Sequence, residues 1–374
     1  MKIPQAFSIY LDLVRAVCAI AVVFHHYNTQ IVRSPEHVFP DVGQEAVTLF
    51  FVLSGFVIAH VARNRERSLV VFTAKRLARI YPVAIAGVVL SYISYAVFSP
   101  SNPALYERYV SDHPWWREVV LTLSFLNQTY WLPQLTPPTN SVYWSLTCEI
   151  WFYVLAGFIF FARMRWTLIA IVVAVPVLGP KIMLLFPAWL AGVGAQRLCD
   201  RIRLSRAHAV AIAVSSGMIG LALWTSGVRF EWRLPGDLVR SWRLGLVSDF
   251  IYYDTLALVA GIHFIAAYNF FARPFRWPTP ISRCVRYAAE SSFSLYAMHF
   301  PVLLALRTSL PQEPFPYFYP VITVGILLVC GRPIEHLRIP AYRLLSALGE
   351  RVRLAAGRAA LADARSSEVP APHR

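Results

Sequence analysis

The sequence predicts an all-α integral membrane protein, a bundle of about ten transmembrane helices with both termini in the cytoplasm. Hydrophobic residues make up 57% of the 374 residues and charged residues 15%, and the mean hydropathy is +0.51. The apolar residues also fall into long runs separated by polar segments. Because a soluble domain of this length carries more charge, the composition excludes a soluble globular protein.

Ten apolar runs have the length expected of membrane spans, for which a helix needs about 20 residues. They are residues 9–27, 46–62, 80–98, 144–162, 166–179, 182–198, 207–225, 249–271, 288–307 and 316–332. The fifth run is short and ends at Pro176 and Pro180, which predicts a tight hairpin with the sixth. The run 119–131 is too short to span, and its flanking prolines favour an interfacial or re-entrant helix.

The basic residues predict the orientation of these helices. With a cytoplasmic N-terminus, 25 of the 35 Lys and Arg residues lie in cytoplasmic segments, nine lie outside, and Arg15 lies within a span. This asymmetry follows the positive-inside rule and predicts that both termini are cytoplasmic. The net charge of +15 therefore reflects membrane orientation, and no nucleic-acid partner is expected.

The remaining segments predict where polar surface lies. Segments 99–143 and 226–248 are expected to face outward, and both are rich in Trp, Tyr and Pro. We predict a transmembrane domain over residues 1–340 and a basic cytoplasmic tail over 341–374 that is partly disordered. The five cysteines have no spacing typical of disulfides or zinc sites, and no HExxH, CxxC or carboxylate cluster is present, so no metal is expected.

The first span carries ionisable residues that a lipid-buried helix tolerates poorly. It includes Asp12, Arg15, His25 and His26, and ionisable residues inside a span usually mark a functional site. Arg15 and His26 are eleven residues apart, so they lie on one stripe of the helix about 16 Å apart along its axis. His25 is turned roughly 80° from that stripe. Helical phase therefore favours His26 over His25 as the reactive histidine.

Arg76 and Arg79 lie one turn apart where the third span enters the membrane from the cytoplasm. One interpretation is a basic anchor on anionic lipid. The other is a phosphate clamp, because guanidinium groups suit phosphate oxygens well. The sequence alone leaves both interpretations open.

Glu149 lies near the outer end of the fourth span, roughly 7 Å below the surface. His26 is predicted at a comparable depth, so the two can form a base and its orienting partner. The alternative is a buried glutamate bound to another polar group. Asp254, near the outer end of the eighth span, is a third candidate for acid–base chemistry.

Ser54 and His299 are secondary candidates that also have structural explanations. Ser54 and Gly55 form a small pair in mid-membrane, which lets two helices approach closely. A nucleophilic serine needs an adjacent base, and nothing nearby in the sequence supplies one. His299 lies in mid-span, where a core histidine with satisfied hydrogen bonds is more typical than a ligand.

Five motifs, taken in order, resemble the acyltransferase-3 family of bacterial inner-membrane proteins that O-acylate glycans and other extracytoplasmic acceptors. They are LDLVRAVCAIAVVFHH, LFFVLSGFVIA, RLARIYP, VYWSLTCEIWFY and SFSLYAMHFP, within about residues 8–335. The resemblance implies about ten helices, a cytoplasmic acyl-CoA donor and an essential arginine–histidine pair in the first span. By position that pair is Arg15 and His26, with Arg76, Arg79 and Glu149 from later motifs. We expect a stand-alone form without the appended periplasmic hydrolase-like domain of many relatives.

The resemblance and the residues together predict a membrane O-acyltransferase. Arg76, Arg79 and Arg15 are expected to bind the phosphates of acyl-CoA, with acetyl as the expected acyl group. His26, oriented by Glu149, either takes the proton of an acceptor hydroxyl or carries the acyl group itself. The expected partners are a glycan or lipid-linked saccharide and membrane lipids. The alternative is a transporter or flippase of glycan intermediates, in which the polar stripe is a proton or substrate path.

Overall fold

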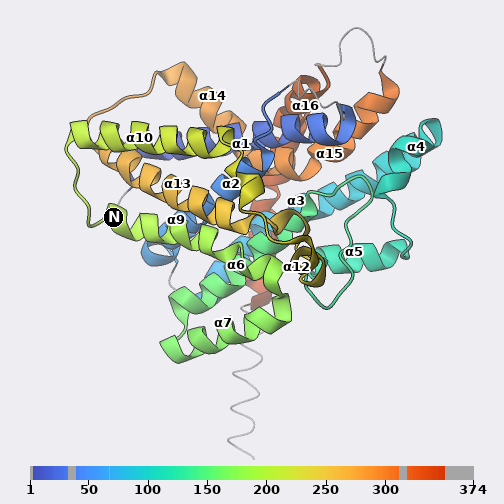
Figure 1. The fold of residues 1–374 in the computed structure, drawn as a ribbon, viewed down its shortest axis with the longest axis horizontal. Coiled ribbons are helices and arrows are strands. Elements are labelled where there is room, and N and C mark those ends of the chain that lie inside the picture. The colour runs from blue at the N-terminus through green and yellow to red at the C-terminus, as the bar shows by residue number, and fades with distance from the viewer. Residues whose placement is uncertain (1–2, 33–38, 67, 311–317, 350–374) are drawn as a thin grey trace, which may run out of the picture.

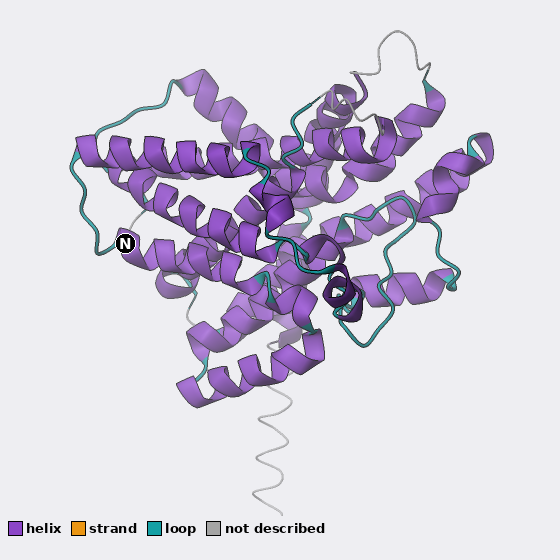
Figure 2. Ribbon diagram, viewed as in Figure 1, coloured by secondary structure: helices purple, strands orange, loops and turns teal. Residues whose placement is uncertain are grey.

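The computed structural model describes residues 3–32, 39–66, 68–310 and 318–349 of the chain. In these ranges every regular element is a helix, which confirms the predicted all-α fold (Figure 2). The long helices are α1 (Gln5–His26), α2 (Gly43–Asn64), α3 (Leu69–Phe98), α6 (Tyr143–Phe161), α7 (Met164–Leu178), α9 (Phe186–Cys199), α10 (Arg206–Thr225), α13 (Phe250–Phe271), α15 (Ser292–Ser309) and α16 (Phe318–His336).

Shorter helices lie in the connections between the long ones. They are α4 (Pro103–Tyr106), α5 (Trp115–Leu123), α8 (Pro180–Met183), α11 (Val228–Glu231), α12 (Gly236–Ser241) and α14 (Thr279–Glu290), with a π-helical segment η1 (Tyr27–Val32) and the 3₁₀ turns η2 (Ser99–Ser101), η3 (Glu107–Tyr109) and η4 (Gly245–Val247).

Each of the ten predicted spans coincides with one long helix. Eight stretches of the described chain are long and apolar enough to cross a membrane, by length and composition. The other two predicted spans are α7, which has 15 residues, and α15, which has 18. A multi-span membrane protein is therefore confirmed, whereas the number ten stays a prediction.

The bundle has two ends, because successive long helices run in opposite directions (Figure 1). At the basic end α1 begins, α2 ends and α3 begins; Arg63 and Lys75 lie there. At the loop end α1 ends and α2 begins, and the predicted outward segments contribute α5, α11 and α12. We predict that the basic end faces the cytoplasm.

Two long helices begin at serines that stabilise their first turns. The Ser68 hydroxyl accepts a hydrogen bond from the Val71 N–H at the start of α3 (3.3 Å). The Ser205 hydroxyl accepts one from the His208 N–H at the start of α10 (3.2 Å). A serine at this position satisfies one of the backbone N–H groups that the helix leaves unpaired.

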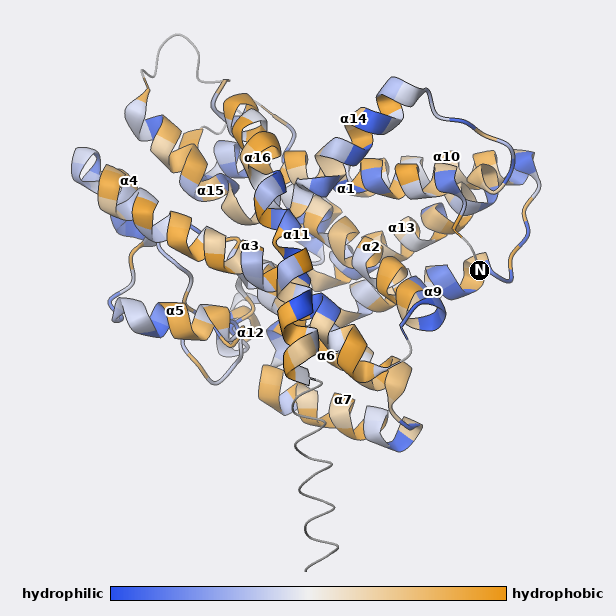
Figure 3. Ribbon diagram, turned by 180° about the vertical axis from the view of Figure 1, so that it is seen from behind, coloured by the Kyte–Doolittle hydropathy of each residue, from blue (hydrophilic) through white to orange (hydrophobic). Residues whose placement is uncertain are grey.

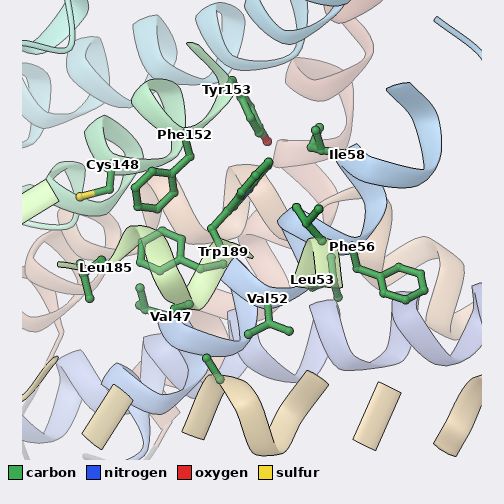
Figure 4. Close-up of a cluster of buried hydrophobic side chains, with 14 of the residues drawn as sticks. Val47, Val52, Leu53, Phe56, Ile58, Cys148, Phe152, Tyr153, Leu185 and Trp189 are labelled. Atoms are coloured by element: carbon green, nitrogen blue, oxygen red, sulfur yellow. The ribbon is translucent and has the colours of Figure 1, made fainter. Parts of the chain in front are cut away.

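α2 and α9 approach so closely that only glycine fits at their crossing. A Cβ atom on Gly55 of α2 would lie 2.0 Å from the Trp189 carbonyl oxygen, and one on Gly192 of α9 would lie 1.9 Å from the Val52 carbonyl oxygen. Figure 4 shows Leu53 of α2 near Trp189 in the core. The predicted packing role of the Ser54–Gly55 pair is therefore confirmed.

The predicted turn between the fifth and sixth spans lies at Gly179, which joins α7 to α8. Its φ of 83° is in the left-handed region, and a Cβ atom there would lie 2.3 Å from the Tyr130 Cβ. Both facts require glycine at this position.

The run 119–131 enters the bundle after α5 ends, as expected of a re-entrant segment. The Phe125 carbonyl accepts a hydrogen bond from the Trp151 indole (2.8 Å), and the Asn127 amide donates to the Leu135 carbonyl (2.7 Å). The Asn140 amide further on donates to the Ala297 carbonyl of α15 (2.9 Å). Non-helical backbone at this depth is stable because protein groups satisfy its hydrogen bonds.

The lateral surface of the bundle is apolar. Val172 of α7 and Met218 of α10 are 69% and 65% exposed. Figure 3 shows hydrophobic residues along α3, α6 and α7, and hydrophilic residues gathered on α14. Such a surface is expected where lipid, and not water, surrounds the protein.

The chain turns at Leu337 after α16 and continues as a helix to Gly349. The predicted start of the tail, residue 341, falls within this helix. Residues 350–374, which form most of the predicted tail, lie outside the described residues.

Candidate active site

Two neighbouring cavities contain most of the predicted site residues. The arginine cavity is a narrow space of about 60 Å³ whose lining includes Arg15, Arg79 and Glu149. The histidine cavity lies at the loop end, has a volume of about 800 Å³, and is lined in part by His25 and His26. The structure thus separates the predicted cationic residues from the predicted histidines.

α1 contributes to both cavities, with Arg15 in the arginine cavity and His25 and His26 in the histidine cavity. Arg15 and His26 are eleven residues apart on one unbroken α-helix, which places them about 16 Å apart along its axis. Asp12 lies one turn before Arg15, and its carboxylate is 3.6 Å from the guanidinium. α1 packs against both α2 and α15, so its polar stripe faces protein, as a charge inside a membrane requires.

His26 lies against a second histidine, His299 of α15. The distance from His26 Nδ1 to His299 Nε2 is 3.0 Å, and from His26 Nδ1 to the Val22 carbonyl it is also 3.0 Å. His299 is fully buried. The sequence suggested a core histidine at 299, but the structure brings this residue to His26, the predicted reactive histidine.

Carbonyl oxygens determine which nitrogens of this pair carry protons. His299 Nδ1 lies 2.7 Å from the Tyr296 carbonyl and 3.2 Å from the Leu295 carbonyl. Because a carbonyl can only accept, His299 Nδ1 carries the proton and neutral His299 Nε2 is an acceptor. His26 Nδ1 must then donate, which leaves the lone pair of neutral His26 on Nε2. His26 Nε2 makes no hydrogen bond within the described part of the chain, so it is free to act as a base.

His25 occupies a different environment from its neighbour. Its Nδ1 bonds the carboxylate of Asp41, and its ring packs on Gly43, where a Cβ atom would lie 2.2 Å from His25 Cγ. The π-helical segment η1 begins directly after His26. Such segments often occur at functional sites, and no sequence signal predicted this one.

The predicted contact between Glu149 and His26 is wrong. The Glu149 carboxylate accepts a hydrogen bond from the Tyr153 hydroxyl and lies 3.3 Å from the Ser54 hydroxyl. It belongs to the arginine cavity, whereas His26 lines the histidine cavity. The predicted similarity in depth did not bring the two residues together, because the position of a side chain also depends on helix rotation and tilt, which a single span does not reveal.

Ser54 lines the arginine cavity and contacts other residues there. Its hydroxyl also lies 3.4 Å from the Trp189 indole N–H, and its exposed fraction is 9%. The sequence supplies no base near Ser54, but the fold places Glu149 beside it. Ser54 thus links α2, α6 and α9 at the point where Gly55 lets the helices approach.

Arg76 and Arg79 have different surroundings, although one helical turn separates them. Arg76 Nη2 lies 2.6 Å from the carboxylate of Glu66, whose side chain is fully buried, and its guanidinium lies over the Phe72 ring at 5.2 Å. Arg79 instead lines the arginine cavity with Arg15. Arg79 is therefore the better placed of the two to meet an anion that enters this cavity.

Asp254 is away from the two cavities. The preceding residue of α13, Tyr253, lines the histidine cavity, but Asp254 is not among the described residues that line either cavity. Its Oδ1 atom is buried and makes no hydrogen bond with the described residues. The structure therefore does not bring this third candidate to His26.

Ion pairs hold the loop-end segment over the histidine cavity. The Asp249 carboxylate accepts hydrogen bonds from Arg233 at 2.7 and 3.1 Å, and Arg229 lies 3.5 Å from Glu45 of α2. The hydrogen bonds that Arg233 donates to Asp249 raise the pKa of Arg233 above its usual range. Further lining is aromatic and polar, with Tyr109, Trp144, Tyr253, Gln30, Gln44 and Ser141.

Glu335 of α16 is a site-supporting residue that the sequence did not reveal. Its carboxylate accepts hydrogen bonds from the backbone N–H groups of Phe293 (3.0 Å) and Ser294 (2.9 Å) in the first turn of α15. A carboxylate there satisfies two unpaired donors and opposes the helix dipole. It therefore fixes the helix that carries His299. No local pattern links residue 335 to residue 293, so this contact needs the fold.

Comparisons with known proteins agree with the geometry. A family model described as an acyltransferase domain, Acyl_transf_3, matches residues 8–331. The chain is also similar to the acyltransferase MdmB of Streptomyces mycarofaciens, with 35% identity over 114 residues, which cover 30% of this chain and 27% of that relative. No solved structure matches. Because this family model matches residues 8–331, the chain belongs to the acyltransferase-3 family, which favours the acyltransferase prediction over the transporter alternative.

Proposed function

We propose that the protein transfers an acyl group, with acetyl the expected one, from cytoplasmic acyl-CoA to a hydroxyl group of a glycan or glycosylated acceptor outside the bacterial inner membrane. One observation carries this proposal: a single helix places Arg15 in one cavity and His26 in a neighbouring cavity. A cation at the donor side and a base at the acceptor side are what acyl transfer across a membrane needs.

The donor approaches from the basic end in this proposal. Arg79 and Arg15 present guanidinium groups to the phosphates and the pantetheine arm, because guanidinium forks bind phosphate oxygens strongly. A cavity of about 60 Å³ is several-fold smaller than a typical ligand pocket of about 300–1,000 Å³. The adenosine part of the donor therefore stays outside, its phosphates lie at the mouth of the cavity beside the guanidinium groups, and the thioester end enters. Arg76 is already paired with Glu66 and contributes less to donor binding.

The acceptor occupies the histidine cavity. Its volume of about 800 Å³ fits a sugar-sized ligand, and its lining combines hydrogen-bonding groups with the rings of Tyr109 and Trp144. Aromatic rings with polar neighbours offer flat apolar contact together with hydroxyl recognition. A lipid-linked saccharide can reach this cavity from the membrane, and a released glycan can reach it from outside.

The chemical step is acyl transfer from sulfur to oxygen. His26 Nε2 takes the proton of the acceptor hydroxyl as its oxygen attacks the thioester carbonyl. The carbon–sulfur bond then breaks, the carbon–oxygen ester bond forms, and the proton passes from His26 to the thiolate, so that CoA leaves as a thiol. A transient acyl group on His26 gives the same products. In both routes His299 orients His26 through the Nδ1 hydrogen bond.

Two measurements test this proposal. Isothermal titration of the purified protein with CoA measures donor binding, and mass spectrometry of surface glycans compares cells with and without the gene. We expect CoA binding and a glycan that is heavier by one acyl unit when the gene is present. Absence of CoA binding together with identical glycans in both cell types contradicts the proposal.

A further inference from the structure

Two residues form the wall between the arginine cavity and the histidine cavity. Val47 of α2 and Tyr296 of α15 are the described residues that line both. Both are buried, with exposed fractions of 8% and 9%. A group that moves from Arg15 and Arg79 toward His26 must therefore pass between them.

Tyr296 is held in this wall by contacts from two other helices. Its hydroxyl is hydrogen bonded to the Ser145 hydroxyl of α6. Its ring meets the Phe50 ring of α2 edge to face, with a centroid separation of 5.6 Å. The Tyr296 carbonyl also accepts the hydrogen bond from His299 Nδ1 (2.7 Å). The ring is thus fixed, and its backbone belongs to the hydrogen-bond chain that orients His26.

We infer that Tyr296 is a specificity-determining residue, which limits the length of the acyl chain that reaches His26 and shields the thioester from water in the histidine cavity. This inference rests on the proposed function. The arginine cavity has a volume of about 60 Å³, and its lining includes Tyr296 and Phe50, whose rings are in contact. A short acyl group can pass Val47, whereas each added methylene must displace a ring that Ser145 holds in place.

The same wall protects the donor. If water replaced the acceptor, His26 Nε2 would take a proton from the water molecule, the carbon–sulfur bond would break, and a carboxylic acid and free CoA would form. The wide histidine cavity admits water, and the wall separates it from the narrow space where the thioester arrives. Removal of the ring is therefore expected to increase acyl-CoA hydrolysis without acceptor.

The test measures CoA release by mass spectrometry from acetyl-, propionyl- and butyryl-CoA, with and without a glycan extract from cells lacking the gene. We expect wild-type protein to prefer acetyl-CoA. Tyr296→Ala is expected to lose discrimination by about tenfold or more for each added methylene. Tyr296→Phe keeps the ring but loses the hydrogen bond to Ser145, and its discrimination is expected to lie between that of wild type and that of Tyr296→Ala. Tyr296→Leu, which leaves an apolar side chain in the wall, is the second variant if the alanine protein does not fold.

Tyr319→Ala is the matched control, because Tyr319 is a buried tyrosine of the neighbouring α16, 3% exposed, and is not among the described residues that line either cavity. It is expected to keep the wild-type preference. An unchanged preference in folded Tyr296→Ala or Tyr296→Leu protein that still transfers acetyl overturns the inference alone. No transfer by wild-type protein from any donor overturns the proposed function and this inference with it.

Discussion

The proton on His26 Nδ1 decides what this residue can do. Two backbone carbonyls fix the proton of His299 on Nδ1, and His299 Nε2 then accepts from His26, so the lone pair of His26 is on Nε2. A carboxylate usually orients a catalytic histidine. Here a neutral histidine does so and adds no charge to the membrane interior, where a charge is costly.

His299→Ala tests this positioning role. Loss of the ring leaves His26 Nδ1 with the Val22 carbonyl as its hydrogen-bond partner and no longer fixes the imidazole from the α15 side. We expect a lower turnover rate, with the affinity for CoA unchanged because His299 is not among the described residues that line the arginine cavity. Single-turnover transfer and isothermal titration measure the two quantities separately. Weakened CoA binding with a normal rate would contradict the positioning role.

Arg79 and Arg76 provide a matched pair on one helix. Arg79→Ala is expected to weaken acyl-CoA binding, because the side chain lines the arginine cavity and its phosphate contacts exist in ground and transition states alike. Arg76→Ala is expected to affect CoA affinity less and to destabilise the protein, because it leaves the buried Glu66 carboxylate without its closest partner. Titration with CoA and thermal unfolding measure both effects. Equal loss of CoA affinity in both variants would contradict this assignment.

The residue pattern predicted part of the site. Helical periodicity placed Arg15 and His26 on one stripe, and the structure places both at cavities of the bundle interior. The contact of His26 with His299, and that of Glu149 with Ser54, join different helices. Their geometry depends on helix rotation and packing, which a single span does not encode.

Close packing of α2 and α9 places Ser54 beside Trp189, and the Ser54 hydroxyl also lies 3.3 Å from the Glu149 carboxylate of α6. A Cβ atom added at Gly55 would lie 2.0 Å from a backbone carbonyl oxygen of the partner helix, and one added at Gly192 would lie 1.9 Å from such an oxygen. A backbone carbonyl cannot rotate away as a side chain can. The position of the arginine cavity therefore depends on two residues without side chains.

Gly192→Ala is expected to lower the free energy of unfolding by about 1–3 kcal/mol, because the helices must separate to admit the methyl group. Gly194→Ala on the same helix is the control, since no atom lies within 4 Å of a Cβ atom added there. That substitution is expected to be neutral or to stabilise the protein by less than about 1 kcal/mol. Thermal unfolding in detergent measures both, and equal melting temperatures for the two variants would contradict the close-packing explanation.

Most helices were predictable because length and apolar composition suffice to define a span. Each of the ten predicted runs coincides with a helix, and Pro176 and Pro180 flank the turn at Gly179. The sequence did not reveal the π-helical segment after His26 or the contact between Glu335 and the start of α15. The contact of Glu335 joins residues that are far apart in the chain, and no residue type in Tyr27–Val32 marks a π-helix.

The whole molecule places its cation-lined and histidine-lined cavities at successive depths between the basic end and the loop end. The charge distribution predicts that the basic end is cytoplasmic. With that orientation the donor and the acceptor enter from opposite sides, which the proposed reaction requires. The opposite orientation would put Arg79 nearer to the outside and would remove the source of acyl-CoA.

Cysteine labelling tests this orientation. Arg63→Cys and Lys75→Cys are expected not to react with a membrane-impermeant thiol reagent in spheroplasts whose inner membrane is intact. They are expected to react after the spheroplasts are lysed. Ser226→Cys, at the loop end, is expected to react in both cases. The background is a variant without Cys284 and Cys330, the exposed cysteines of the described chain. Labelling of position 63 or 75 in intact spheroplasts would reverse the predicted topology.

Transfer of a labelled acetyl group by purified protein is the most direct measurement of the proposed chemistry. Labelled acetyl-CoA is mixed with glycan from cells lacking the gene, and ester formation is followed for wild type, His26→Ala and His25→Ala. We expect His26→Ala to lose about 10²–10⁴-fold in rate, while CoA binding stays intact and His25→Ala keeps substantial activity. A transfer rate of His26→Ala equal to that of wild type would contradict the assignment of His26 as the residue that accepts the hydroxyl proton. Loss of activity in His25→Ala but not in His26→Ala would contradict it as well.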